Sequence, residues 1–265
     1  MRLIPAGMNI GTDPDFGPYA LTIQTAFYMD ATEVTKAQWD VVYTWAVTNG
    51  YSFDSPGFGK DENHPVYFVN WYDCAKWCNA RSEKEGLTPC YWVSIDLYRT
   101  GQSSPQCNFE SANGYRLPTV QEWEYSARGG LPSKRFPWGD TITHTEANYF
   151  SSVYCSFDTS PTRNMHPSFE VGDQPFSNPA GSFAPNGYGL YDMAGNVQDW
   201  CWDGYWQLPD MYRRIRGGSY GARAEVARCG YNGYRYPTSA DRNVGFRTVC
   251  VPSAVKEPPA LMQGR

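Results

Sequence analysis

Three oxygen-bearing side chains lie close together in the stretch of residues 187–202: Asp192, Asn196 and Asp199. A glycine precedes Asn196 in what the pattern predicts to be a tight turn, and two tryptophans follow. If those tryptophans are buried, the neighbouring carboxylates are buried with them and need a counter-charge. A hard cation such as Ca²⁺ binds carboxylates together with backbone carbonyls of a tight loop, so the stretch predicts a calcium site. The alternative is a plain turn with solvated aspartates.

The histidines and cysteines offer weaker chemistry. No pair of histidines has the i, i+4 spacing of a helical metal site, and we expect all three to be ordinary loop residues: His64, His144 and His166. The eight cysteines contain no Cys-x-x-Cys motif. Cys74 and Cys78 are one helical turn apart, which favours buried thiols on a helix face. Cys229 could be a lone nucleophile, but without an identifiable histidine partner a structural role is favoured.

Bulk properties exclude several classes of function. The chain has 265 residues and a net charge of −5, which argues against nucleic acid as the partner because phosphate binding needs a concentrated basic face. No apolar run is long enough to span a bilayer. The first residues lack the long apolar segment of a signal peptide, which predicts a cytoplasmic protein unless a signal peptide has been removed.

The local patterns predict a loop-rich α+β fold with few helices and short antiparallel strands. Capping boxes at Thr35 and Thr119 predict helices that end near residues 49–50 and 129–130, and Asn70 predicts a third that ends near Gly86. Short strands are expected over residues 66–69, 214–220 and 244–249, whereas residues 132–185 show almost no regular period. We expect one domain over residues 1–251 and a polar, proline-rich tail over 252–265.

Six blocks of sequence, in the same order, resemble the formylglycine-generating enzyme (sulfatase-modifying factor) family. They are Phe27–Trp39, His64–Trp71 with Asp73–Cys78, Tyr115–Tyr125 with Phe136–Gly139, Gly189–Trp200, Arg216–Tyr220 and Asn243–Arg247. They span nearly the whole chain. The resemblance implies the family's variant of the C-type-lectin-like fold, although a fold does not by itself fix a function.

The resemblance also implies two structural calcium sites. In one, Asp192 and Asp199 would provide side chains, and Gly195 and Val197 would provide backbone carbonyls. In the other, Asn148 and the carbonyl of Tyr149 match the family's positions, and Asp158 is a further candidate. Calcium in these sites would hold loops that have no hydrogen-bond ladder of their own.

The family's enzymes oxidise a substrate cysteine with two active-site cysteines that bind copper. The first lies two residues past the Gly-Gly-Ser-Tyr motif, where this chain has Ala222, and the second lies five residues further on, at Ala227. Cys229 matches a separate family cysteine, across a short deletion. A Cu(I) site needs thiolates, which alanine cannot supply, so we expect neither bound copper nor formylglycine-generating activity.

The segment between the last two predicted strands has the composition of a binding surface. Tyr, Arg, Ser and Asn side chains provide rigid aromatic contacts and adaptable hydrogen bonds. The candidate ligand-binding residues are Tyr220, Arg223, Glu225, Arg228, Tyr231, Asn232, Tyr234, Arg235, Tyr236, Ser239, Asp241 and Arg242. The layout also resembles that of variable proteins diversified by retroelements, whose variable region ends near Gly-Phe-Arg.

Two hypotheses follow from these patterns. The first is a protein that binds a protein or small-molecule ligand through residues 220–242 on a calcium-braced scaffold. The second is an oxidoreductase of the same family that works without the cysteine pair.

Overall fold

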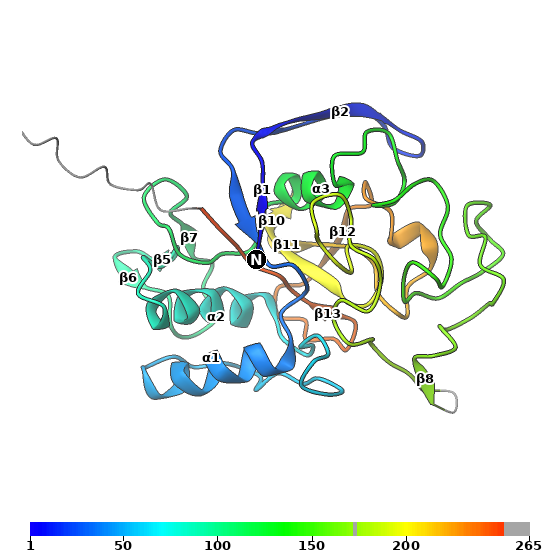
Figure 1. The fold of residues 1–265 in the computed structure, drawn as a ribbon. Helices are drawn as coiled ribbons and strands as arrows, with labels where there is room; N and C mark the ends of the chain where they lie inside the picture. The colour runs from blue at the N-terminus through cyan, green and yellow to red at the C-terminus, as the bar shows by residue number, and fades with distance from the viewer. Residues whose placement is uncertain (172–173, 252–265) are drawn as a thin grey trace, which may run out of the picture.

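The computed structural model describes residues 1–171 and 174–251, and it has the loop-rich α+β architecture expected from the sequence (Figure 1). Its described α-helices are α1 (Lys36–Thr48), α2 (Trp71–Lys84) and α3 (Val120–Arg128), and η1 (Ala224–Val226) is a 3₁₀ turn. The predicted tail, residues 252–265, lies outside the described residues. The fold class is confirmed.

The strands are short and form small, mostly antiparallel sheets. One sheet has the order β1 (Arg2–Ile4), β4 (Phe27–Met29), β14 (Val249–Cys250), and β2 (Gly7–Asp13) pairs with β3 (Gly17–Ile23). The excursion after α2 has the order β6 (Asp96–Leu97), β5 (Tyr91–Val93), β7 (Gln106–Cys107), and β8 (Glu170–Val171) pairs with β9 (Gln174–Pro175). The four-stranded sheet has the order β12 (Gly233–Arg235), β11 (Leu208–Arg216), β10 (Gln198–Tyr205), β13 (Val244–Gly245).

The helices begin where their capping residues predict. The Thr35 side chain accepts a hydrogen bond from the Gln38 amide at 3.2 Å, and the Gln38 side chain accepts one from the Thr35 amide at 3.0 Å. Thr119 and Glu122 form the same reciprocal pair at the start of α3. Each pair satisfies two amides that a helix N-terminus would otherwise leave unpaired, which is why both boundaries are sharp.

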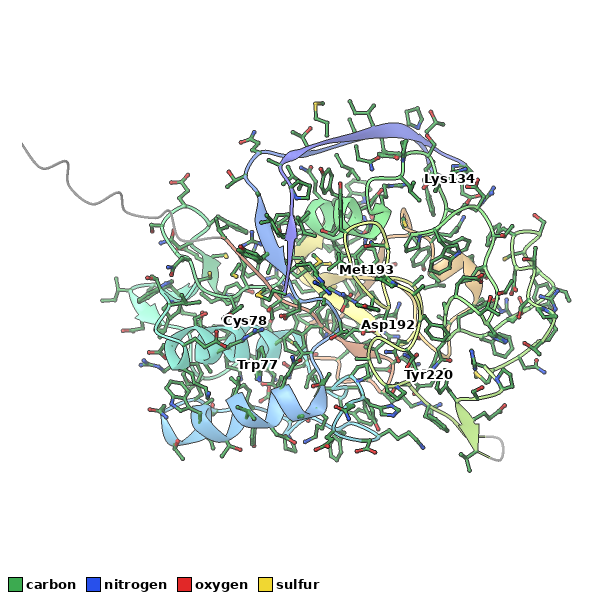
Figure 2. All side chains as sticks on the ribbon, viewed as in Figure 1. Trp77, Cys78, Lys134, Asp192, Met193 and Tyr220 are labelled. Carbon is green, nitrogen blue, oxygen red and sulfur yellow. The ribbon has the colours of Figure 1, made fainter. Side chains whose placement is uncertain are left out.

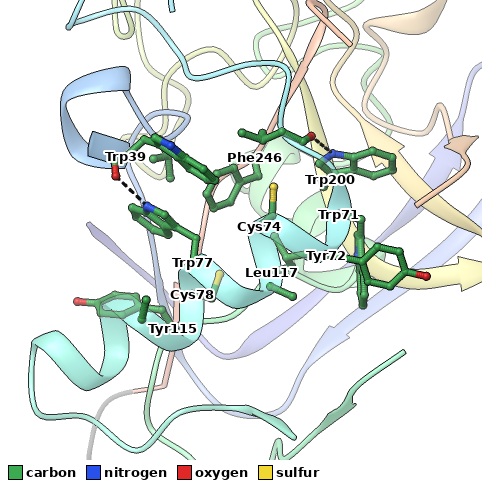
Figure 3. Close-up of a cluster of buried hydrophobic side chains, with 14 of the residues drawn as sticks. Trp39, Trp71, Tyr72, Cys74, Trp77, Cys78, Tyr115, Leu117, Trp200 and Phe246 are labelled. Atoms are coloured by element: carbon green, nitrogen blue, oxygen red, sulfur yellow. Dashed lines mark hydrogen bonds between the residues drawn. The ribbon is translucent and has the colours of Figure 1, made fainter. Parts of the chain in front are cut away.

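Tryptophans fill the main core, between the α1–α2 pair and the four-stranded sheet. The rings of Trp39 and Trp77 stack with centroids 5.9 Å apart, and Phe246 meets Trp39 edge-on at 6.0 Å (Figure 3). The indole of Trp200 donates a hydrogen bond to the Val69 carbonyl at 3.1 Å. The aromatic rings therefore bury large apolar surfaces while their polar atoms remain paired.

The expectation for two cysteines on α2 is confirmed. Cys74 and Cys78 are fully buried in the tryptophan core (Figure 3). Burial raises the pKa of both thiols well above the ordinary value, because a thiolate would lose its solvation there. They therefore behave as core residues.

Two of the strand predictions are wrong. Residues 66–69 make one isolated bridge, Phe58 to Tyr67, and Phe68 has a left-handed φ of 54°. Residues 244–249 do not form one strand, because β13 pairs with β10 and β14 pairs with β4 in a different sheet. The third predicted strand, residues 214–220, is only partly a strand. β11 ends at Arg216, because Gly217 and Gly218 have positive φ values of 88° and 74°.

Candidate functional site

Within the stretch 187–202, residues 192–197 form a buried loop that leads into β10, in the interior of the molecule (Figure 2). Asp192 and Asn196 both have left-handed φ values, 52° and 57°, and Gly195 has a φ of 89°. The amide of Gly195 donates to the Gly217 carbonyl at 2.8 Å, and that of Asn196 donates to the Asn148 carbonyl at 2.9 Å. Backbone contacts with two distant segments hold this turn.

Asp199 lies at the centre of a buried charge network. Its Oδ2 accepts hydrogen bonds from the Trp123 indole and from Arg247 Nε, both at 2.8 Å, whereas its Oδ1 has no hydrogen-bond partner within residues 1–171 and 174–251. Glu33 is also fully buried, and neither of its carboxylate oxygens accepts a hydrogen bond from any described residue. Arg247 Nη2 lies 3.9 Å from Glu33 Oε2.

The carboxyl pKa values reflect this crowding. Burial raises the pKa of Glu33 well above its ordinary value, and the nearby charge of Asp192 raises it further. Burial likewise raises the pKa of Asp192 and of Asp199, although Arg247 opposes the shift in both. One guanidinium thus faces three buried carboxyl groups, an imbalance that an additional cation would relieve.

These residues fit part of the calcium site implied by the family resemblance. The unpaired oxygens of Asp199 and Glu33 are hard ligands of the kind that Ca²⁺ prefers. Asp192, in contrast, accepts hydrogen bonds from the Asn178 side chain at 3.2 Å and from the Gly181 amide at 2.6 Å. Within residues 1–171 and 174–251, no group of three or more His, Cys, Asp or Glu is arranged to hold a metal ion. Calcium here, with the Gly195 and Val197 carbonyls, stays a prediction.

The other implied calcium site has less support. The Tyr149 carbonyl accepts a hydrogen bond from His144 Nε2 at 3.1 Å, and the Asn148 side chain donates to the Phe176 carbonyl at 3.0 Å. Asp158 accepts hydrogen bonds from the Tyr149 hydroxyl at 2.6 Å and from the Ser152 amide at 2.7 Å, among others. Because protein donors already occupy the oxygens of Tyr149 and Asp158, these two residues do not fit a calcium site as they are arranged, and that site stays an expectation.

The two alanines at the positions of the family's copper-binding cysteines offer no metal ligand. Ala227 is fully buried, and the Ala222 carbonyl accepts a hydrogen bond from the Phe150 amide at 2.9 Å. Burial raises the pKa of the Cys229 thiol to about 12. Burial and a hydrogen bond to Glu225 raise that of Cys155 to about 11. Neither thiol ionises readily near neutral pH, so these residues do not fit a copper site.

The three histidines are loop residues with structural partners. The rings of His144 and His166 lie 4.9 Å apart, and His166 Nε2 bonds to the His144 carbonyl at 2.8 Å. His64 Nδ1 bonds to the Ser177 hydroxyl at 3.0 Å. Burial lowers the pKa of each ring, so the neutral forms are favoured in the folded protein.

The structure does not gather the twelve candidate ligand-binding residues on one surface. Tyr220 is buried, and its hydroxyl donates to the Arg242 carbonyl at 3.4 Å. Arg228 forms an ion pair with Asp15 at 2.9 Å and also donates to the Glu225 carbonyl. Arg223 lies elsewhere, at a cleft that it lines together with residues 150–154 and 163–164. Of the twelve, those that are exposed beyond residue 230 are Asn232, Tyr234, Tyr236 and Arg242, while Tyr231, Arg235, Ser239 and Asp241 are half-buried.

Tyr234 and Tyr236 belong to a larger aromatic surface, which we call the tyrosine face. Its members come from β10, β11, β12 and the segments next to them: Tyr205, Trp206, Tyr212, Tyr234 and Tyr236. The ring of Tyr234 lies 4.5 Å from Tyr205 and 5.1 Å from Tyr212, and Tyr212 lies 4.6 Å from Tyr236. Trp206 is 72% exposed, and Tyr234 and Tyr236 are 49% and 53% exposed.

Sequence reasoning missed three members of this face, Tyr205, Trp206 and Tyr212. They lie outside residues 220–242, and they join the face only because β11 pairs with both β10 and β12. The available signal was the aromatic pair at 205–206 together with Tyr212, seven positions after Tyr205, a spacing that favours a hairpin.

The helices of residues 1–171 and 174–251 do not include one that is long and apolar enough to cross a lipid bilayer.

Two curated relatives resemble most of the chain. The chaperone protein LppX of Paenibacillus barcinonensis is 32% identical over 233 residues, which cover 84% of this chain and 79% of that protein. The inactive C-alpha-formylglycine-generating enzyme 2 of Mus musculus is 35% identical over 232 residues, which cover 84% of this chain and 68% of that protein.

Solved structures and a family model agree with these relatives. CarF superposes with a TM-score of 0.75 at 27% identity, covering 95% of this chain and 98% of that one. The variable protein 1 of Treponema denticola superposes with a TM-score of 0.70 at 25% identity, covering 95% of each chain. The model of the sulfatase-modifying factor enzyme 1-like domain matches residues 1–251. The chain therefore belongs to the sulfatase-modifying factor enzyme 1-like domain family.

Proposed function

We propose that this protein is a ligand-binding protein and that the tyrosine face is its principal contact surface. The observation that carries the proposal is a group of aromatic rings in mutual contact, in which Trp206, Tyr234 and Tyr236 are exposed and Tyr205 and Tyr212 are half-buried. A monomeric protein rarely leaves a contiguous aromatic surface in water unless another molecule covers it. Tyrosine and tryptophan provide large contact areas at low conformational-entropy cost, and they are enriched at the centres of protein interfaces.

Polar groups beside the face can add specificity. Arg214 lies over the Tyr205 ring at 4.8 Å, and Arg235 forms an ion pair with Asp241 at 3.1 Å, where both side chains are about one third exposed. A partly exposed ion pair such as Arg235–Asp241 adds directional hydrogen bonds around an apolar centre, the usual anatomy of a protein interface. We infer a peptide or protein ligand.

The chemistry of the cysteine positions supports binding over oxidation, because Ala222 and Ala227 supply no thiolate. The names of the relatives also favour binding over oxidation: LppX is named a chaperone, the mouse relative is named an inactive enzyme, and the Treponema denticola structure is named a variable protein.

We further propose that the exposed part of residues 220–242 is a retroelement-diversified segment. A template repeat of this segment and a reverse-transcriptase gene beside the coding sequence would support that proposal, and a neighbourhood that lacks both would contradict it.

We also propose a structural calcium ion at Asp199, with Glu33, Asp192 and the carbonyls of Gly195 and Val197 as further candidate ligands. The support is the set of unpaired oxygens on Asp199 and Glu33. Bound calcium would neutralise the surplus of buried carboxylates and would fix the turn that leads into β10.

The test uses random peptides displayed on phage as the probe. Peptides selected on the wild-type protein are synthesised, and their dissociation constants are measured with the wild type and with two variants. The triple variant Tyr212→Ser/Tyr234→Ser/Tyr236→Ser should lose binding, while the control Tyr28→Ser, at an exposed tyrosine of β4 outside the face, should keep it. Melting temperatures show whether each variant is folded.

Two outcomes would overturn the proposal. One is equal binding of the selected peptides to the wild type and the folded triple variant. The other is a selection that enriches no peptide above the level obtained on the triple variant.

A further inference from the structure

A cleft of about 360 Å³ lies outside the tyrosine face, where three segments far apart in the sequence meet. Its walls come from residues 150–154, from Arg163 and Asn164, and from Arg223. In Figure 1 the η1 turn, which follows Arg223, lies beside the loops of residues 141–170. A cleft of this volume matches the lower end of the range for small-molecule sites.

Backbone hydrogen bonds hold the three segments side by side. The Phe150 amide donates to the Ala222 carbonyl at 2.9 Å, and Ser151 and Asn164 exchange two hydrogen bonds at 2.7 and 2.9 Å. Residues 150–151 are thus flanked by Arg223 on one side and by Asn164 on the other. Neighbouring strands are about 4.8 Å apart, so the backbones of the two outer segments are about 10 Å apart. Long arginine side chains can span that gap.

Arg223 differs from most other arginines of the protein. Its guanidinium lies over the Tyr154 ring at 4.7 Å, but among the described residues it makes no ion pair and no side-chain hydrogen bond. Both side chains are exposed. A stacked guanidinium is held in place while its five donors stay free, which prepares it to bind an anion in a bidentate manner.

Arg163 adds a second, partly free cation. Its Nη1 donates to Ser151 Oγ at 3.1 Å and to Asp158 Oδ1 at 3.2 Å, whereas no hydrogen bond from its Nε or Nη2 is made to the part of the chain that the structure describes. The side chain is 39% exposed. The cleft walls contain no acidic residue, although the whole protein has a net charge of −5. The cleft is therefore a local basic site on an acidic protein.

We propose that this cleft binds an oxyanion (a carboxylate, sulfate or phosphate) carried on a small apolar body. Arg223 is the principal anion ligand, Arg163 is the second, and Val153 and Tyr154 contact the apolar body. The anion can belong to a free small molecule or to an acidic side chain of a peptide. The site is independent of the tyrosine face, so either can fail without the other.

Isothermal titration calorimetry at low ionic strength tests the proposal with defined probes. Phenyl phosphate and benzoate represent free anions, benzamide is the uncharged control, and an N-acetylated, C-amidated Gly-Asp-Phe peptide represents an acidic side chain. We expect the anions to bind and benzamide not to bind. Tighter binding of the peptide than of benzoate would identify an acidic peptide as the source of the anion, and the reverse would identify a small molecule.

Two variants make the result specific to the cleft. Arg223→Gln should raise the dissociation constant about tenfold or more, because it removes the charge-assisted hydrogen bonds of one guanidinium. Arg2→Gln, at an exposed arginine outside the cleft, should leave it unchanged. Backbone amide shifts in ¹H–¹⁵N spectra should move for residues 150–154, 163–164 and 223.

The proposal is overturned if the wild type binds none of the anions at millimolar concentration. It is also overturned if the folded Arg223→Gln variant binds phenyl phosphate as tightly as Arg2→Gln does.

Discussion

Replacing Gly195 tests the packing of the buried turn most directly. Its φ is +89°, and an added Cβ would lie 2.4 Å from the carbonyl oxygen of Asn148 and 3.0 Å from its carbonyl carbon. That oxygen also accepts the Asn196 amide at 2.9 Å, so it cannot move away without breaking a hydrogen bond. We therefore expect Gly195→Ala to displace both segments.

A matched glycine separates the steric effect from the backbone effect. Gly50 has a φ of +84°, and an added Cβ there would meet nothing within 4 Å. An alanine in the left-handed region costs about 1–2 kcal/mol, which is all that Gly50→Ala should lose. Overpacking against backbone adds about 1–3 kcal/mol for Gly195→Ala. The free energies of unfolding should then differ by about 2 kcal/mol, or about 4–8 °C in melting temperature.

The assay is urea denaturation of both variants and the wild type in EDTA, so that bound metal does not contribute. Calorimetric melting temperatures provide a second, independent measure. Equal losses of stability in Gly195→Ala and Gly50→Ala would refute the close approach of residues 195 and 148. The glycine would then be needed for its φ alone.

Three further predictions concern charge. In Arg247→Met, Asp199 and Glu33 lose their buried cation, and urea denaturation should show a loss of about 3–5 kcal/mol. Burial lowers the pKa of His144 and His166 below 6.5, so the stability from the neutral rings is complete above pH 6.5 and is lost as pH falls. Because the buried carboxyl groups of Glu33, Asp192 and Asp199 respond to pH in the opposite sense, the histidine effect is measured as a difference: between about pH 7.5 and 5.5 the urea midpoint of the wild type should fall relative to that of His144→Gln. Calcium at about 100 times its Kd should stabilise the wild type by about 2.7 kcal/mol, and scanning calorimetry of Asp199→Asn should show a much smaller effect.

The helix starts could be predicted from sequence because their signals are local. Thr35 and Thr119 each need only a partner three residues ahead, and that partner is present in both cases. Gly129 ends α3 with a φ of 55°, which again depends on one residue type. Such features do not depend on what the rest of the chain does.

The strands could not be predicted equally well because distant segments decide their pairing. The amides of Val66, Tyr67 and Phe68 donate to the carbonyls of Val34, Phe58 and Asp241, respectively. Consecutive amides thus pair with three different segments, so no ladder of hydrogen bonds forms. Three members of the tyrosine face, Tyr205, Trp206 and Tyr212, were missed for the same reason. Arg214 pairs with Tyr234 across β11 and β12, and the register of β10 shifts between Trp200 and Gly204. A register shift changes which side chains share a face, and hydrophobic periodicity does not report it.

The buried site was predicted only in part, and its missing member shows why. Asp192 and Asp199 lie in one stretch, so their proximity could be read from spacing. Glu33 is more than 150 positions away and joins them only in the fold, where Arg247 faces both Glu33 and Asp199. The position of Glu33 before a helix cap offered no signal of burial.

The division between core and surface explains how this scaffold can change function without losing its fold. The network of Trp123, Asp199 and Arg247 holds the interior and includes no member of the tyrosine face. Exposed substitutions usually change stability by less than about 0.5 kcal/mol, so residues such as Tyr234 and Tyr236 are free to vary. Removing a thiolate pair at positions 222 and 227 also leaves this network intact. A chain with alanine at positions 222 and 227 can therefore keep the rigid frame of its family, on which the exposed side chains can change with little cost in stability.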